Sequence, residues 1–230
     1  MDSVFQENTS TLAIRQTAPV VNLIYLCDCS GSMAGSRIAT VNTALNKALA
    51  ELIEFSDVYP KLKFQMAVLR FANTATWHIP PSPVEQLRYS PLVDTSGLTA
   101  LGAAYDLLAD YLIQVEAQAS KLALPPLPPI LILFSDGMPT DDVATALAKL
   151  AAQPLAQTSL RLAIGIGDQV DTAVLQAWIQ AWQQQQPSVP KATKLAARQL
   201  AIAGSTLEVC ELVSVFTAEA IGRLLTETPP

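Results

Sequence analysis

The sequence predicts a doubly wound α/β fold: a mostly parallel central sheet with one antiparallel edge strand and helices on both faces. Three observations carry this prediction. Apolar runs alternate along the chain with segments of helical periodicity. Several of these runs are unbroken rather than alternating, which is typical of strands buried on both faces. The chain has 230 residues, of which 50% are hydrophobic and 15% charged, enough for one α/β core.

The N-terminal half predicts three strands and two helices. After Ser36, which is expected to cap a helix, Ile38, Val41 and Leu45 recur at helical spacing. Pro80-Pro81-Ser82-Pro83 is expected to break the chain after the antiparallel edge strand. In order, the expected elements are a central strand at Val20–Cys27, a helix at Arg37–Phe55, strands at Lys63–Phe71 and Thr74–Ile79, and a helix at Ala100–Val115.

The C-terminal half continues the alternation, and the six strands are expected in the spatial order 3-2-1-4-5-6. Residues 178–203 are expected to form an inserted helical segment before the last strand, either as packing or as a docking element. Its basic residues Lys191, Lys194 and Arg198 share a helix face, which is either a solvated surface or a binding surface. The expected elements are strands at Pro129–Phe134, Leu160–Ile166 and Thr206–Cys210, and helices at Asp142–Ala152 and Thr172–Gln183.

Oxygen-bearing side chains adjoin three predicted elements at one edge of this sheet. Asp28-Cys29-Ser30-Gly31-Ser32 comes directly after the central strand, and Asp136 follows the Pro129–Phe134 strand. Thr99 stands at the start of a predicted helix. Parallel strands bring their carboxyl ends to one edge, where open α/β folds bind ligands. One carboxylate and two hydroxyls at alternate positions offer the hard oxygen ligands that a small divalent cation prefers.

The same residues also have a purely structural interpretation. Thr99 and Thr140 could be helix N-caps, and Asp28 and Asp136 could cap turns at strand ends. A metal site accounts for all of the candidate ligands together, whereas separate caps leave their common location unexplained. Two further acidic residues in a helix's first turn, where the dipole favours negative charge, are expected to be caps rather than ligands: Asp141 and Asp142.

From Val20 to about Leu225 the chain resembles a von Willebrand factor A domain with a metal-ion-dependent adhesion site. Residues 1–18 are polar and turn-rich and are expected to form an N-terminal arm or a short edge element, ahead of the domain at 19–230. The resemblance implies a bound Mg²⁺ or Mn²⁺ that recognises an Asp or Glu of a partner protein. Two details depart from the common pattern, a Ser-Gly-Leu-Thr second loop and Cys29, and neither removes an oxygen ligand. The implied ligands are Asp28, Ser30, Ser32, Thr99 and Asp136.

A narrower resemblance concerns the third loop, Ser135 to Asp142, and the later stretch Ala163 to Asp168. Both are similar to the bacterial intracellular branch of the family that includes tellurite-resistance-associated members. This implies a cytoplasmic adaptor or scaffold in a stress or defence system, with a kinase, phosphatase or ATPase of the same gene cluster as partner. A regulatory subunit of a chelatase-like ATPase motor is the alternative. A phosphatase-type enzyme is disfavoured because Ser30 stands where such an enzyme needs a second Asp, so no catalysis is expected.

Composition narrows the partners and the compartment. A net charge of −6 disfavours nucleic acid. The N-terminus does not read as a signal peptide, and no stretch reaches the roughly 18 apolar residues of a membrane span, so a cytoplasmic location is expected. Cys27, Cys29 and Cys210 are expected to be buried thiols. Zinc bound by these thiols with His78 is disfavoured, because C-x-C is not the usual ligand spacing.

Overall fold

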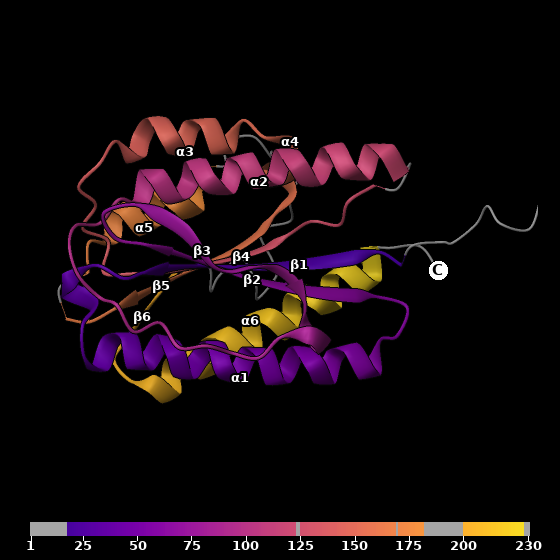
Figure 1. Ribbon diagram of the computed structural model, residues 1–230, viewed down its shortest axis with the longest axis horizontal. Helices are drawn as coiled ribbons and strands as arrows, with labels where there is room; N and C mark the ends of the chain where they lie inside the picture. Colours follow the sequence, from indigo (N-terminus) through magenta and orange to yellow (C-terminus); the bar gives the residue numbers. More distant parts are fainter. Residues whose placement is uncertain (1–17, 123–124, 169, 182–199, 228–230) are drawn as a thin grey trace, which may run out of the picture.

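The computed structural model describes residues 18–122, 125–168, 170–181 and 200–227, and it confirms the predicted fold class. A six-stranded sheet has the order β3-β2-β1-β4-β5-β6, as predicted (Figure 1). Only the β2–β3 pair is antiparallel. The strands are β1 (Val20–Asp28), β2 (Lys63–Phe71), β3 (Ala75–Pro83), β4 (Ile130–Ser135), β5 (Leu160–Ile166) and β6 (Leu200–Ala203).

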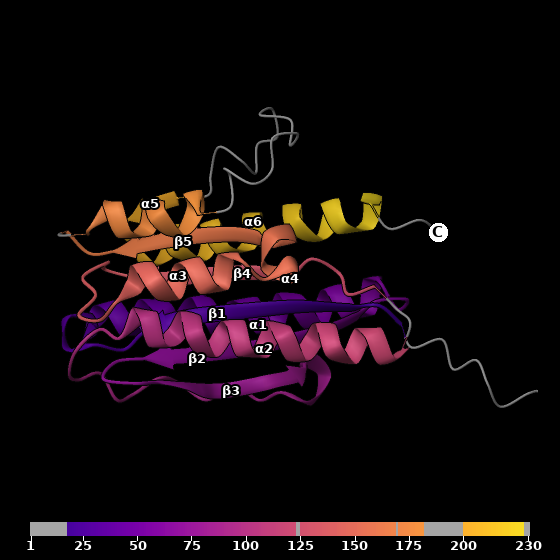
Figure 2. The same ribbon diagram turned by 90° about the horizontal axis from the view of Figure 1, so that it is seen from above.

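Helices cover both faces of the sheet (Figures 1 and 2). One face carries α1 and α6, and the other carries α2, α3, α4 and α5. The α-helices are α1 (Ser36–Val58), α2 (Leu101–Leu122), α3 (Val143–Ala151), α4 (Pro154–Thr158), α5 (Thr172–Gln180) and α6 (Thr206–Glu227). Two 3₁₀ turns complete the described elements: η1 (Gly31–Met33) and η2 (Val84–Gln86). No helix in these ranges combines the length and the apolar composition needed to cross a bilayer.

The two hydrophobic cores explain why the central strands read as unbroken apolar runs. Successive side chains of a strand point to opposite faces. Leu23 and Tyr25 of β1 accordingly pack beneath α1 and α6, whereas Ile24 and Leu26 pack beneath the helices of the other face. All six residues of β4 are buried. Both faces must therefore be apolar, and the pair β1 and β4 forms a rigid base for the loops that follow them.

The edge strand β3 differs from its prediction. It runs through Pro83 instead of breaking at Pro80, and it pairs with β2 on one side only. Proline cannot donate a hydrogen bond to a ladder, but an edge strand leaves one row of backbone groups unpaired and so tolerates it. The predicted cap Ser36 is also wrong, because it is the first residue of α1 and Gly35 holds the N-cap position without a side-chain bond.

The predicted last strand at Thr206–Cys210 is wrong as well: these residues begin α6, and β6 precedes them at Leu200–Ala203. The Ser205 hydroxyl accepts the Glu208 N–H, and the Glu208 carboxylate accepts the Gly204 N–H. This S-x-x-E arrangement starts a helix.

The expected helical segment 178–203 is only partly described. Residues 178–180 are helical, as part of α5. Residues 200–203 form the strand β6, so the helical prediction is wrong for those four residues. Residues 182–199, which include Lys191, Lys194 and Arg198, lie outside the described residues, as do residues 1–17 of the predicted arm.

Candidate metal centre

Two strands place the candidate carboxylates side by side. Cys27 of β1 pairs in register with Phe134 of β4, and the two strands are parallel. Asp28 is the last residue of β1, and Asp136 follows β4 directly. Both carboxylates therefore emerge at the carboxyl edge of the sheet, as the sequence predicted. They are close enough that the charge of Asp136 contributes to the pKa of Asp28.

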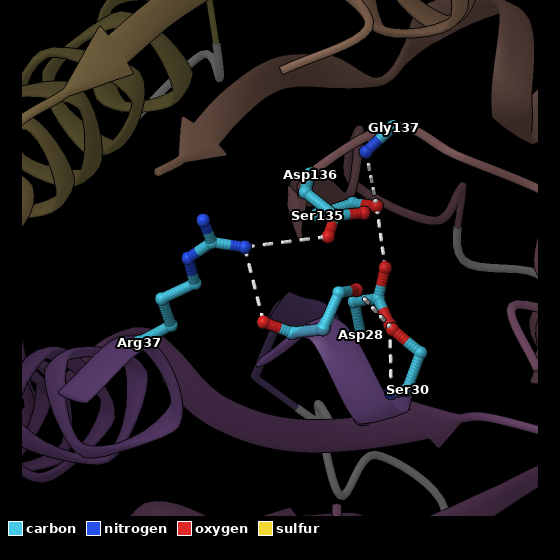
Figure 3. Close-up of polar contacts among 7 residues, drawn as sticks. Asp28, Ser30, Arg37, Ser135, Asp136 and Gly137 are labelled. Carbon is cyan, nitrogen blue, oxygen red and sulfur yellow. Dashed lines mark hydrogen bonds and ion pairs between the residues drawn. The ribbon is translucent and has the colours of Figure 1, made fainter. Parts of the chain in front are cut away.

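The Asp28 carboxylate is fully buried and held by two hydrogen bonds. Its oxygens accept the Ser30 N–H at 2.9 Å and the Ser135 hydroxyl at 2.7 Å (Figure 3). Burial raises the pKa of Asp28 above its usual value; the bonds from Ser135 and Ser30 oppose this shift, and the Asp136 charge adds to it. A charged Asp28 is therefore costly in the bare protein, and a bound cation would offset that cost.

The two hydroxyls of the first loop lie in contact with each other. Ser30 Oγ and Ser32 Oγ are 3.0 Å apart. Adjacent oxygens around an octahedral Mg²⁺, each about 2.0–2.1 Å from the ion, are themselves separated by about 3 Å. The spacing of this pair thus fits two neighbouring ligands of one small cation.

Backbone hydrogen bonds tie the second loop to the other two. The Gly31 N–H donates to the Gly97 carbonyl at 3.2 Å, joining the first and second loops. Thr99 accepts the Thr140 N–H at its carbonyl at 2.9 Å and donates its own N–H to the Thr140 hydroxyl at 3.2 Å. Thr140 therefore joins two loops instead of acting as the helix cap that was the alternative. Thr99 is buried at the junction of all three loops.

Asp136 contains the most informative atom of the site. Its Oδ1 is buried, and no hydrogen-bond partner for it is found within the described ranges. Its Oδ2 lies 3.7 Å from Nη1 of Arg37 (Figure 3). Buried polar atoms in proteins are nearly always paired, so an unpaired carboxylate oxygen beside Asp28 needs an explanation. A cation held by hard oxygen ligands supplies one, and the residues present fit such an ion.

The neighbouring acidic residues are caps, as predicted, although they serve different helices. The Asp142 carboxylate accepts the Thr145 N–H and caps α3. The Asp141 carboxylate accepts the N–H groups of Gly102 and Ala103 at the start of α2, far away in the sequence. Asp141 thus joins the third loop to the helix that follows Thr99.

Sequence reasoning missed Arg37. The Arg37 guanidinium donates to the Ser32 carbonyl at 3.0 Å in addition to its contact with Asp136. The sequence does place Arg37 in the first turn of the predicted helix, where a positive charge opposes the helix dipole. Such a charge is unfavourable without an anionic partner, and this is the signal that could have indicated its role.

The three cysteines are free and buried, which confirms the thiol interpretation. Burial raises the pKa of Cys29 to about 11, so its thiol stays protonated near neutral pH. Cys210 lies on α6. His78 lies on the edge strand β3, where its ring bonds to the Ser90 carbonyl at 2.7 Å. In the part of the chain described, no group of three or more His, Cys, Asp or Glu side chains is arranged to hold a metal. A site here would need hydroxyl ligands beside its two carboxylates.

A family profile described as "von Willebrand factor type A domain" matches residues 22–188. No curated protein matches the chain.

Solved structures of similar fold include a von Willebrand factor type A protein from Catenulispora acidiphila, at 17% identity and a TM-score of 0.57, over 89% of this chain and 43% of that one. The pilus adhesin SpaC from Lactobacillus rhamnosus GG has 14% identity and a TM-score of 0.59, over 91% of this chain and 31% of that one. Proximal thread matrix protein 1 from the mussel byssus, with a zinc-occupied MIDAS motif, has 13% identity and a TM-score of 0.52, over 88% and 46% of the two chains. The present chain thus spans less than half of each.

Proposed function

The chain belongs to the von Willebrand factor type A domain family, and we propose that it is a protein-binding module that recognises a partner's carboxylate through a divalent cation. One observation carries the proposal: the buried Oδ1 of Asp136, which has no hydrogen-bond partner among the described residues, lies at the same sheet edge as the buried Asp28. The residues proposed to hold the cation are Asp28, Ser30, Ser32, Thr99 and Asp136.

The composition of this ligand set suggests what the cation would do. Only two of the five donors carry charge, so a bound divalent ion would still favour a further anionic oxygen as a ligand. Hard oxygen donors favour Mg²⁺ or Mn²⁺. When bound, the ion would supply an electrophilic position for an Asp or Glu side chain of the partner. The chain's own task would be to hold five oxygens in place, and the hydrogen bonds between its three loops support this task.

Apolar side chains beside the site support a protein partner over a free small anion. Leu98 directly precedes Thr99 and is 60% exposed; Met138 follows Asp136 by two residues and is 58% exposed. Exposed apolar groups flanking a charged centre resemble the mixed composition of protein interfaces, in which large side chains surround a desolvated core. A peptide can cover both side chains while it presents its carboxylate to the ion.

We propose binding without catalysis, in a bacterial intracellular stress or defence system. The absence of catalysis rests on Ser30, which stands where a phosphatase-type enzyme needs a second Asp, and the setting rests on the residues Ser135 to Asp142 and Ala163 to Asp168, which resemble that branch of the family. A kinase, phosphatase or ATPase encoded nearby would be the partner. A chelatase-like role beside an ATPase motor would use the same metal chemistry and differs only in the partner.

Selection from a displayed library of random peptides tests the proposal. The chain is immobilised with excess Mg²⁺, and bound peptides are eluted with EDTA. We expect the eluted peptides to share an Asp or Glu and to rebind with Mg²⁺ but not with EDTA. Calcium is larger and less demanding of octahedral geometry, and should support binding poorly. Peptides that rebind equally well in EDTA, or that share no acidic residue, would contradict the proposal.

A further inference from the structure

We propose that Arg37 is the second anchor for the partner's carboxylate and therefore a specificity-determining residue of the site. One carboxylate oxygen binds the cation, and the guanidinium donates to the other. This inference rests on the proposed function and goes further, because it assigns a role to a residue outside the metal-ligand set. It also defines the ligand as a carboxylate group, one oxygen of which binds the divalent ion while the other accepts from the Arg37 guanidinium.

The position of the guanidinium is fixed by the site itself. Nη1 donates to the Ser32 carbonyl at 3.0 Å and lies 3.7 Å from Asp136 Oδ2. Figure 3 shows this side chain reaching from α1 across to Asp136. A carboxylate bound to an ion held by Ser32 and Asp136 therefore comes within reach of Arg37, because Arg37 already contacts both of those residues.

Gly167 supports the guanidinium from the loop after β5. A Cβ atom on Gly167 would lie 2.6 Å from Arg37 Cζ and 2.7 Å from both Nε and Nη2. A side chain here would displace the guanidinium from this position, and the φ of Gly167, 111°, is in the region that favours glycine. The absence of a side chain at Gly167 thus leaves room for the guanidinium where it lies.

The guanidinium retains capacity for a further anion. Its contacts within the described ranges use only Nη1, and the Arg37 side chain remains 31% exposed. Arginine carries five N–H donors in a planar fork that matches a carboxylate. Charge-assisted bonds of this kind are shorter and stronger than neutral ones.

The location on α1 adds an energetic argument. Arg37 is the second residue of that helix, where the dipole disfavours a positive charge. Its pairing with Asp136 offsets part of this cost, and a bound carboxylate would offset more. A neutral residue would avoid this cost altogether. The positive charge therefore does not stabilise the helix, whereas it can stabilise an anion bound at the site.

The test compares the wild-type chain with Arg37→Gln and Arg37→Lys. The probe is one acidic peptide obtained by the Mg²⁺-dependent selection described above, and calorimetry measures Mg²⁺ and peptide affinities separately. Arg37→Gln should bind Mg²⁺ at least as tightly, because a positive charge near the ion is removed. It should bind the peptide about tenfold more weakly. Arg37→Lys, which keeps the charge but not the fork, should fall between them.

Arg88→Gln is the matched control, since Arg88 is exposed and the change removes the same charge from the chain. It should leave both affinities unchanged. Equal peptide affinity in wild type and Arg37→Gln would overturn the inference and leave the proposed function standing. Weaker Mg²⁺ binding by Arg37→Gln would also overturn it, because Arg37 would then organise the metal ligands. Failure to select any Mg²⁺-dependent acidic peptide would overturn the proposed function and this inference together.

Discussion

Replacing Asp28 by Asn is expected to abolish divalent-cation binding while the chain stays folded. The change removes one of the two carboxylates proposed to hold the ion but preserves the side chain's size. Asn can still accept the Ser30 N–H at its Oδ1, and its Nδ2 can donate to the Ser135 hydroxyl oxygen in place of the bond that Asp28 accepts from Ser135. Calorimetric titration with Mg²⁺ and Mn²⁺ should show an affinity reduced on the order of 100-fold or more, since even outer-shell changes cost 10- to 100-fold.

Asparagine is a better test than alanine because Asp28 is buried at a strand end and is not part of a surface loop. Alanine would leave the Ser30 N–H and the Ser135 hydroxyl unpaired, at a cost of about 1–3 kcal/mol each. Loss of binding could then reflect loss of structure. Asp142→Asn is the matched control, because it makes the same change at the exposed cap of α3 and should leave metal affinity intact.

Stability of the metal-free protein gives Asp28→Asn a second, independent readout. Burial raises the pKa of Asp28, so its ionised form opposes folding at neutral pH. Asp28→Asn should therefore unfold at an equal or higher temperature than wild type in EDTA. The difference should shrink as pH falls through the raised folded-state pKa toward the usual Asp value, where Asp28 becomes protonated. Unchanged metal affinity in Asp28→Asn would contradict the ligand assignment.

Gly137→Ala is expected to be the most destabilising change at the site. Gly137 has a φ of 78°, and a Cβ there would lie 2.5 Å from the Asp171 carbonyl oxygen, a backbone atom that cannot move alone. The Asp171 N–H bonds to the Asp136 carbonyl at 2.8 Å, so any shift of that segment displaces a proposed ligand. We expect a loss of about 2–4 kcal/mol in the free energy of unfolding, measured by urea denaturation.

Gly35→Ala distinguishes the cost of an unusual backbone conformation from the cost of a steric clash. Gly35 has nearly the same φ, 77°, but nothing lies within 4 Å of a Cβ built there. With a ψ of −126°, Gly35 has a backbone conformation that residues with a Cβ rarely adopt, so Gly35→Ala should lose about 1–3 kcal/mol from strain alone, less than Gly137→Ala. Equal losses in the two variants would show that the contact between Gly137 and Asp171 does not constrain the third loop.

Much of the fold could be predicted because central strands are buried on both faces. The bounds of β2 and β5 match the prediction residue for residue, since both segments are mostly apolar and mostly buried. The strand order also followed from the alternation of elements. Prediction was wrong at the sheet's periphery, where the pattern is weaker: β3 continues through prolines, and the four-residue β6 is too short to show a period.

The candidate ligands could be found for a similar reason, because strand ends are visible in sequence and parallel strands bring those ends together. The structure places Asp28 and Asp136 at one edge and ties the loop of Thr99 to both; that they bind a cation stays a prediction. Arg37 could not be found this way. Its contacts depend on a turn of α1 and on Gly167, 130 residues later, and no local pattern encodes their meeting.

A double-mutant cycle between the chain and its peptide tests the bridging cation most directly. Calorimetry in Mg²⁺ measures four affinities: wild-type or Asp28→Asn protein, with a selected peptide or the same peptide whose acidic residue is amidated to Gln or Asn. If the ion links Asp28 to the peptide's carboxylate, each change alone should remove most of the binding, and both together should remove little more, giving a large coupling energy. Losses that simply add, or an Asp28→Asn chain that distinguishes the two peptides as strongly as the wild type does, would contradict a metal-bridged interface.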